Sequence, residues 1–248
     1  FLTSITLFIP IMWLISNAFS AIFENITILG LFLKESLNSI MLALSGSILI
    51  IIIAAIICFT QRIYGGPLNF FLNMAKVGYA SPGIVIAIGV ITPIMYFDRT
   101  INKLFLNFNY DVGLIVSGSL FVLVFAYLTR FLAVAFNPIE AAYQKVNRKI
   151  DSAASNLGAN NNTLFFKIHI PMLASSFLIG FLLVFIDILK ELPATLILRP
   201  FNFNTLSILT FEYASSEQLQ MAAIPALIIT ILAIIPLTLV HLILKIKR

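Results

Sequence analysis

Residues 36–61 read SLNSIMLALSGSILIIIIAAIICFTQ and contain no Asp, Glu, Lys or Arg. A helix needs about 20 apolar residues to cross roughly 30 Å of hydrocarbon, so this stretch is long enough to span a bilayer. The part from Ile48 to Phe59 does not alternate apolar and polar residues, as a strand of a membrane barrel would. Because lipid offers the backbone no water to bond, the stretch predicts a transmembrane helix.

The same pattern recurs along the chain. Hydrophobic residues make up 60% of the 248 positions and charged residues only 10%, against about 45–50% and about 25% in average soluble domains. That excess cannot be hidden in one soluble core, which excludes a soluble enzyme, a disordered protein and a nucleic-acid-binding module. Charge-free stretches of 18 residues or more cover 1–23, 36–61, 77–97, 112–129, 168–186 and 218–244. We therefore expect an all-α polytopic membrane protein with six transmembrane helices in one domain, 1–248, and the lipid bilayer as a partner.

The basic residues predict the orientation of the helices. If both termini are cytoplasmic, ten of the 15 Lys and Arg residues lie on the cytoplasmic side and five lie outside. Basic residues accumulate in cytoplasmic loops of membrane proteins, so this orientation is favoured. The chain enters an apolar segment directly at Phe1, without Met and without a basic leader. We interpret it as part of a longer polypeptide.

The sequence lacks several common nucleotide-binding and catalytic motifs. There is no Gly-Lys dipeptide, and therefore no Walker A phosphate loop. There is also no His-Glu-x-x-His, no Gly-x-Ser-x-Gly, and only one cysteine, Cys58. We expect no catalytic residue, no metal site and no cofactor bound by this chain.

The longest predicted cytoplasmic loop covers 131–170 and is the most polar part of the chain. Asp151 or Ser152 can cap a short helix of small residues, and Gly158 can end it in a left-handed turn. The run 160–163, Asn-Asn-Asn-Thr, offers a second cap, and Pro171 can begin the next membrane helix. On composition alone, an ordinary amphipathic connector is an equal alternative.

The spacing in this loop resembles the EAA motif of binding-protein-dependent ABC importer permeases. That motif is Glu-Ala-Ala, three residues, Gly, nine residues, Ile, one residue, Leu-Pro. Five positions of this chain fall in register, and Ile170 replaces the Leu conservatively. Ser152 stands where the family has Glu, and Asp151 is the adjacent acid. The matching positions are Ala153, Ala154, Gly158, Ile168 and Pro171.

This resemblance implies a MetI-like permease fold in which the loop is a coupling helix seated on a separate ATPase. ATP is then bound by an ABC ATPase subunit dimer and not by this chain. The other implied partners are a second permease half, fused or separate, and a periplasmic substrate-binding protein. The implied location is the bacterial cytoplasmic (inner) membrane.

Further stretches are similar to one branch, the ferric iron importer permeases, over about residues 78 to 236. They are 78–89, 126–134, 190–201, 212–214 and 222–227. Those permeases are often fused from two six-helix halves, and this chain resembles the second half. Thiamine, phosphonate, sulfate and polyamine permeases are alternatives within the family. A self-contained secondary transporter or channel, and a membrane enzyme acting on lipids, are alternatives outside it.

Charges near a membrane centre are costly and usually have a purpose. Asp187, Lys190 and Glu191 follow each other at helical spacing near the outer end of the fifth predicted helix, where they can share one face and pair. They form either an interfacial ion pair that fixes helix depth or a polar gate on the translocation pathway. Glu191, Glu212 and Tyr213 can supply hard oxygen ligands transiently to ferric iron. We expect Arg130 to extend to the inner headgroups.

Overall fold

The computed structural model describes residues 2–24, 28–65, 74, 76–108 and 110–246. Within these ranges the chain forms helices and no strand. In chain order the elements are α1 (Leu2–Glu24), α2 (Ile28–Tyr64), α4 (Gly83–Leu106), α5 (Leu120–Lys145), α6 (Lys149–Asn156), α7 (Asn161–Thr163), the π-helix η1 (Leu164–His169), α8 (Ile170–Leu189), α9 (Pro193–Leu198), α10 (Leu206–Ser215) and α11 (Leu219–Ile246).

Five helices in the described ranges are long and apolar enough to cross a membrane. They cover Phe32–Tyr64, Gly83–Leu106, Leu120–Lys145, Asn161–Leu189 and Leu219–His241. The remaining predicted span, 1–23, corresponds to α1, whose described side chains form a shorter apolar stretch, Phe8–Phe23. The chain is thus an all-α, multi-pass membrane protein, as the charge-free stretches predicted.

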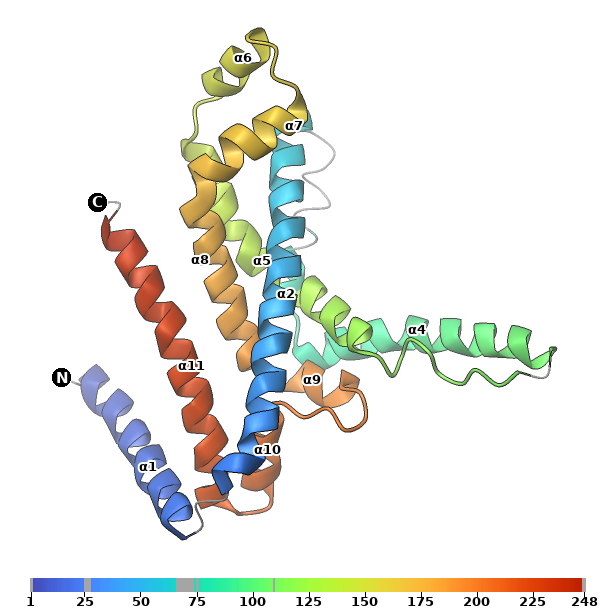
Figure 1. Ribbon diagram of the computed structural model, residues 1–248, viewed down its shortest axis with the longest axis vertical. Coiled ribbons are helices and arrows are strands. Elements are labelled where there is room, and N and C mark those ends of the chain that lie inside the picture. The colour runs from blue at the N-terminus through green and yellow to red at the C-terminus, as the bar shows by residue number, and fades with distance from the viewer. Residues whose placement is uncertain (1, 25–27, 66–73, 75, 109, 247–248) are drawn as a thin grey trace.

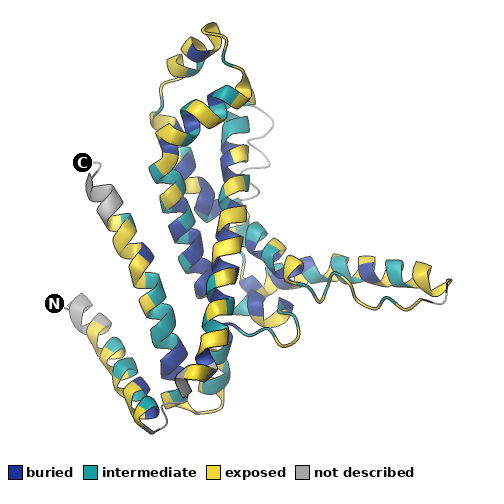
Figure 2. Cartoon of the chain, viewed as in Figure 1, coloured by how far each residue is buried: buried dark blue, intermediate teal, exposed yellow. Residues whose placement is uncertain are grey.

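The centre of the molecule is a bundle of α2, α5 and α8 (Figure 1). Their buried faces form one continuous core, which includes Ala43, Cys58 and Leu123, and Figure 2 shows these faces in dark blue. Small residues let the helices approach closely. At Gly180 of α8, an added Cβ would lie 3.2 Å from the carbonyl oxygen of Ala135 in α5. A smaller apolar cluster joins α1 and α11 to the start of α2.

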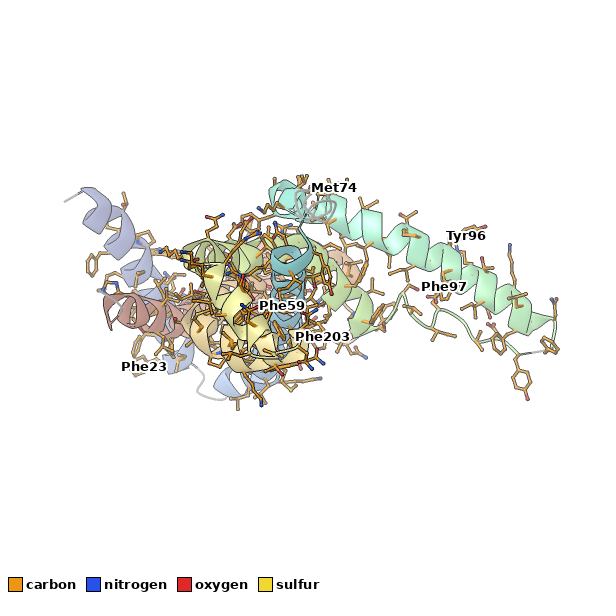
Figure 3. The ribbon with its side chains drawn as sticks, turned by 90° about the horizontal axis from the view of Figure 1, so that it is seen from above. Phe23, Phe59, Met74, Tyr96, Phe97 and Phe203 are labelled. Carbon is orange, nitrogen blue, oxygen red and sulfur yellow. The ribbon has the colours of Figure 1, made fainter. Side chains whose placement is uncertain are left out.

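α4 leaves this bundle sideways (Figure 1) and is the least buried of the helices of membrane length in the described chain. Seen from above, Tyr96 and Phe97 stand on this arm, away from Phe59 in the bundle (Figure 3). The buried Asp98 accepts hydrogen bonds from the backbone N–H groups of Val116 (3.1 Å) and Ser117 (2.7 Å). The segment 110–119 is therefore fastened along α4 and is not helical.

Two predicted helix boundaries are wrong, each for a different reason. The predicted fourth helix, 112–129, begins only at Leu120, because Asp98 holds the backbone before it in a non-helical form. The predicted third helix, 77–97, is interrupted at Ser81, and α4 starts after Pro82. Proline lacks a backbone N–H and disfavours a helical residue before it.

α5 is longer than the sequence predicted. It continues through Arg130 to Lys145, so residues 131–145, assigned to the cytoplasmic loop 131–170, are helical instead. Phe131, Phe136 and Ile139 are buried in the core. Arg130 ended the charge-free stretch, but its charge is neutralised within the protein, as described below, and does not end the helix.

The polar segment after α8 forms two short helices, α9 and α10, separated by a turn at Phe201 and Asn202, where Asn202 has a positive φ of 60°. Both helices lie at the end of the bundle opposite α6 (Figure 1). α1 begins and α11 ends toward the α6 side of the molecule (Figure 1).

Gly78 provides a test of this packing. A Cβ at Gly78 would lie 2.1 Å from the backbone oxygen of Thr129, whereas Gly89 has no neighbour within 4 Å of such an atom. We expect Gly78→Ala to lower stability by about 1–3 kcal/mol through overpacking, seen as a lower Tm in detergent. Gly89→Ala is the matched control and should leave Tm unchanged or raise it. Equal Tm values for the two variants would contradict the close approach of 78–83 to α5.

Candidate functional site

The loop predicted to couple to an ATPase lies at one end of the bundle and is built around α6 (Figure 1). Gly158 ends this helix with φ +82°, so the left-handed turn predicted there is confirmed. The N–H of Ala159 bonds the carbonyl of Ala154 (3.0 Å), and the N–H of Gly158 bonds that of Ser155 (3.0 Å). This pair of bonds is a complete Schellman motif, which satisfies the last carbonyls of the helix.

The start of α6 differs from the prediction. The helix begins at Lys149, whose N–H bonds the side chain of Asn147 (2.9 Å), so neither Asp151 nor Ser152 is the cap. Asp151 sits in the first turn and points inward, where Arg62 donates to it from Nε (2.7 Å).

The rest of α6 divides into an inner and an outer face. Ala154 is buried, whereas Ser152 and Ala153 are exposed. The most prominent side chain is Leu157, which is 90% exposed beside the Gly158 turn. Leu157 is therefore accessible to a second protein.

The second half of the loop leads directly into the membrane helix. Asn160 caps α7 by accepting from the N–H of Thr163 (2.8 Å), as predicted. The chain then continues through η1 into α8 without a break. Ile168 and Ile170 are half-buried and Pro171 is exposed at the start of α8. Pro171 cannot donate to the carbonyl four residues earlier, and the wide π-turn lies directly before it. π-turns within helices occur frequently at functional sites.

The predicted pathway residues do not form one group. Asp187 and Lys190 pair at 2.7 Å, as their spacing indicated. They line a cavity of about 410 Å³ between α5 and α8, together with Asn137 and Tyr79 among others.

Glu191 has a different partner. Its side chain is 5% exposed and lies 3.4 Å from Nε of Arg130 in α5. One carboxylate oxygen also accepts the N–H of Ala194 (3.1 Å). Gly83 at the start of α4 completes this site, because an added Cβ would meet both the guanidinium and the carboxylate. The expected extension of Arg130 to the headgroups is therefore wrong: its charge is paired inside the protein.

Glu212 and Tyr213 are also engaged separately. Arg199 donates to Glu212 (2.9 Å), and the Tyr213 ring packs edge-on against Phe32 with centroids 6.0 Å apart. Within the described ranges, no three His, Cys, Asp or Glu side chains gather as a metal site would require.

Sequence reasoning missed the long-range partners of these acids. Arg62 is 89 residues from Asp151, and Arg130 is 61 residues from Glu191. The one available signal was that Arg62 and Arg130 each directly follow a charge-free stretch. His169, which the sequence reasoning gave no role, is fully buried beside Asp151.

Comparison with known proteins supports the family resemblance. The chain is 27% identical over 207 residues to the Fe(3+)-transport system permease protein FbpB 2 of Haemophilus influenzae, covering 83% of this chain and 38% of that protein. It thus spans about two fifths of the length of that relative. A chain in the crystal structure of a bacterial alginate ABC transporter, in complex with an alginate pentasaccharide-bound periplasmic protein, superimposes with a TM-score of 0.63 at 11% identity. That match covers 100% of this chain and 95% of the other. No family model matches the chain. The resemblance to ABC importer permeases and the permease fold are both confirmed.

The two predicted pathway acids should respond differently to substitution. Glu191→Ala leaves Arg130 as an uncompensated charge inside the protein, which costs about 3–5 kcal/mol. Asp187→Ala frees Lys190, whose side chain is 62% exposed, so its cost should be small. We expect a clear drop of Tm in detergent for the first variant only. A comparable drop for both would show that Asp187 is as structural as Glu191.

Proposed function

We propose that the chain is the transmembrane permease subunit of an ATP-driven ABC importer. The observation that carries this proposal is α6: a short helix at one end of the bundle, closed by a complete Schellman motif and with an exposed apolar tip at Leu157. The chain runs from this helix through α7 and η1 into α8. A force applied to α6 therefore has a short, helical path into the membrane.

The partner that applies this force would be an ABC ATPase dimer, which binds and hydrolyses ATP in place of this chain. Leu157 and Ala153 lie on the exposed side of α6, where a separate subunit can reach them. Closure of the ATPase would push the coupling loops together and rock the membrane helices. Such rigid-body movement about an interface is an established kind of switching transition.

The remaining parts of the importer follow the same proposal. The bacterial cytoplasmic membrane holds the chain, with α6 and both ends of this segment on the cytoplasmic side. A periplasmic binding protein delivers the substrate to the opposite end, near α9 and α10. A second permease half, fused or separate, packs beside this one. The support is that the ferric iron permease of Haemophilus influenzae is more than twice as long as the region that matches this chain. The exposed apolar surface of the α4 arm, which includes Ile88 and Tyr96, suits such a contact.

We further propose ferric iron as the substrate. The support is the similarity to the ferric iron permease named above. The fold does not select the cargo, because the alginate transporter shares it. Asp187 at the α5–α8 cavity offers a hard oxygen ligand of the kind that ferric iron prefers.

The exposed tip of α6 gives a test of the ATPase contact. Leu157→Glu places a charge at the centre of the proposed interface, and we expect co-purification of the ATPase to fall by about tenfold or more. Phe201→Glu is the matched control, because Phe201 is 98% exposed at the opposite end of the bundle. Retention of the ATPase by the Leu157 variant would contradict the proposed docking surface.

The substrate is tested by uptake. We expect a strain that lacks this gene to lose uptake of radioactive ferric iron and to regain it with the wild-type gene. Thiamine, phosphonate, sulfate and a polyamine, assayed in the same strain, should be taken up normally. Loss of one of these and not of iron would replace the substrate and leave the permease function intact.

A further inference from the structure

Arg62, in the last turn of α2, holds three partners with one side chain. Its Nε donates to Oδ2 of Asp151 (2.7 Å), and its two terminal nitrogens donate to the carbonyl oxygens of Tyr143 (2.9 Å) and Val146 (3.1 Å). The Arg62 side chain is only 6% exposed. A planar guanidinium in such a fork fixes the directions of its partners as well as their distances.

The two carbonyls belong to the end of α5, which stops at Lys145. The last carbonyls of a helix have no partner within the helix and must be satisfied from outside. Arg62 thus closes the end of α5 and at the same time holds the first turn of α6. The connection between these two helices, residues 146–148, is clamped from α2.

The other oxygen of Asp151 faces α8. Oδ1 lies 3.2 Å from Nε2 of His169, at the end of η1, close to it but without the geometry of a hydrogen bond. The His169 ring is fully buried and packs against Phe59 of α2 and Tyr143 of α5, with centroids 5.5 and 5.2 Å apart. The Asp151 carboxylate therefore lies against Arg62 of α2 and His169 at the start of α8. The end of α5 is linked to the same group because Arg62 also donates to the carbonyl of Tyr143.

The position of this acid in the sequence explains its direction. Ser152, and not Asp151, stands at the acidic position of the resembled motif. One residue along an α-helix corresponds to a rotation of about 100°. The carboxylate is thereby turned from the exposed face, where Ser152 lies, toward Arg62.

We propose that Asp151, Arg62 and His169 form a joint that makes α6 move as one body with the ends of α2, α5 and α8. This inference rests on the proposed permease function, because it describes how force from the ATPase enters the membrane helices. Asp151 is then a positioning residue within the chain and not a contact to the ATPase. Without the joint, α6 would still dock, but its movement would be absorbed by the connections on either side.

The test compares Arg62→Gln, Asp151→Asn and the double variant in the complete transporter. We expect each single variant to keep the ATPase bound and to lower transported substrate per ATP hydrolysed by at least about fivefold, in the range of coupling energies between sites. The double variant should be no worse than Arg62→Gln alone, because that change already removes the contact with Asp151. Asp151→Glu, which keeps the charge, should recover part of the ratio.

Lys76→Gln is the matched control. It breaks the nearby pair between Lys76 and Glu140 (2.8 Å), which does not include α6, and it should leave the transport ratio unchanged. A second measurement needs no ATPase: hydrogen exchange of the α6 amides should accelerate in the Arg62 and Asp151 variants and not in Lys76→Gln.

The two levels of the proposal can fail separately. Unchanged ratios and unchanged α6 exchange in the single variants, or losses that multiply in the double variant, would overturn the joint while the permease function stands. A wild-type chain that binds no ATPase would overturn the permease function, whatever the exchange data show.

Discussion

The absence of water from the bilayer interior constrains every part of this structure. Backbone and charged groups within the spans are stabilised by partners inside the protein, since an unsatisfied group costs several kcal/mol in lipid. Serine and threonine side chains accordingly donate to carbonyls of their own helices, as Thr92 does to Ile88 (2.7 Å) and Thr230 does to Ala226 (2.8 Å). The same requirement brings Arg130 to Glu191 and explains why Gly83, with no side chain, lies against that pair.

The charge-free stretches predicted the number of long apolar segments well, because helix length in a membrane depends mainly on composition. They failed at the helix ends, because a charge marks a boundary only when it reaches water. Arg130 lies inside α5 with a partner, and Asp98 holds a non-helical segment against α4. Both effects depend on residues distant in sequence, which the local pattern does not contain. The turn at Gly158 was predictable because a helix end is a local event.

The Arg62–Asp151 pair and the Arg130–Glu191 pair connect different parts of the structure. At the α6 end, one arginine ties a surface helix to the membrane bundle, so the polar loop is continuous with the core. At the other end, Ser207 and Thr195 both donate to the backbone oxygen of Glu191 (2.9 and 2.8 Å), which ties α9 and α10 to the end of α8. α8 is therefore fastened at both ends, and a movement received at one end reaches the other through a single helix.

The burial of Cys58 has a practical consequence. It is the only cysteine of the chain and its side chain packs in the core between α2 and its neighbours. Cys58 lines a cavity together with Arg62 and Tyr143, but its side chain is only 3% exposed, so a thiol reagent such as a maleimide should react with it slowly. Within these 248 residues, a cysteine introduced at a surface position would be more accessible than Cys58, so its labelling from either face of a sealed vesicle can map the topology of this segment.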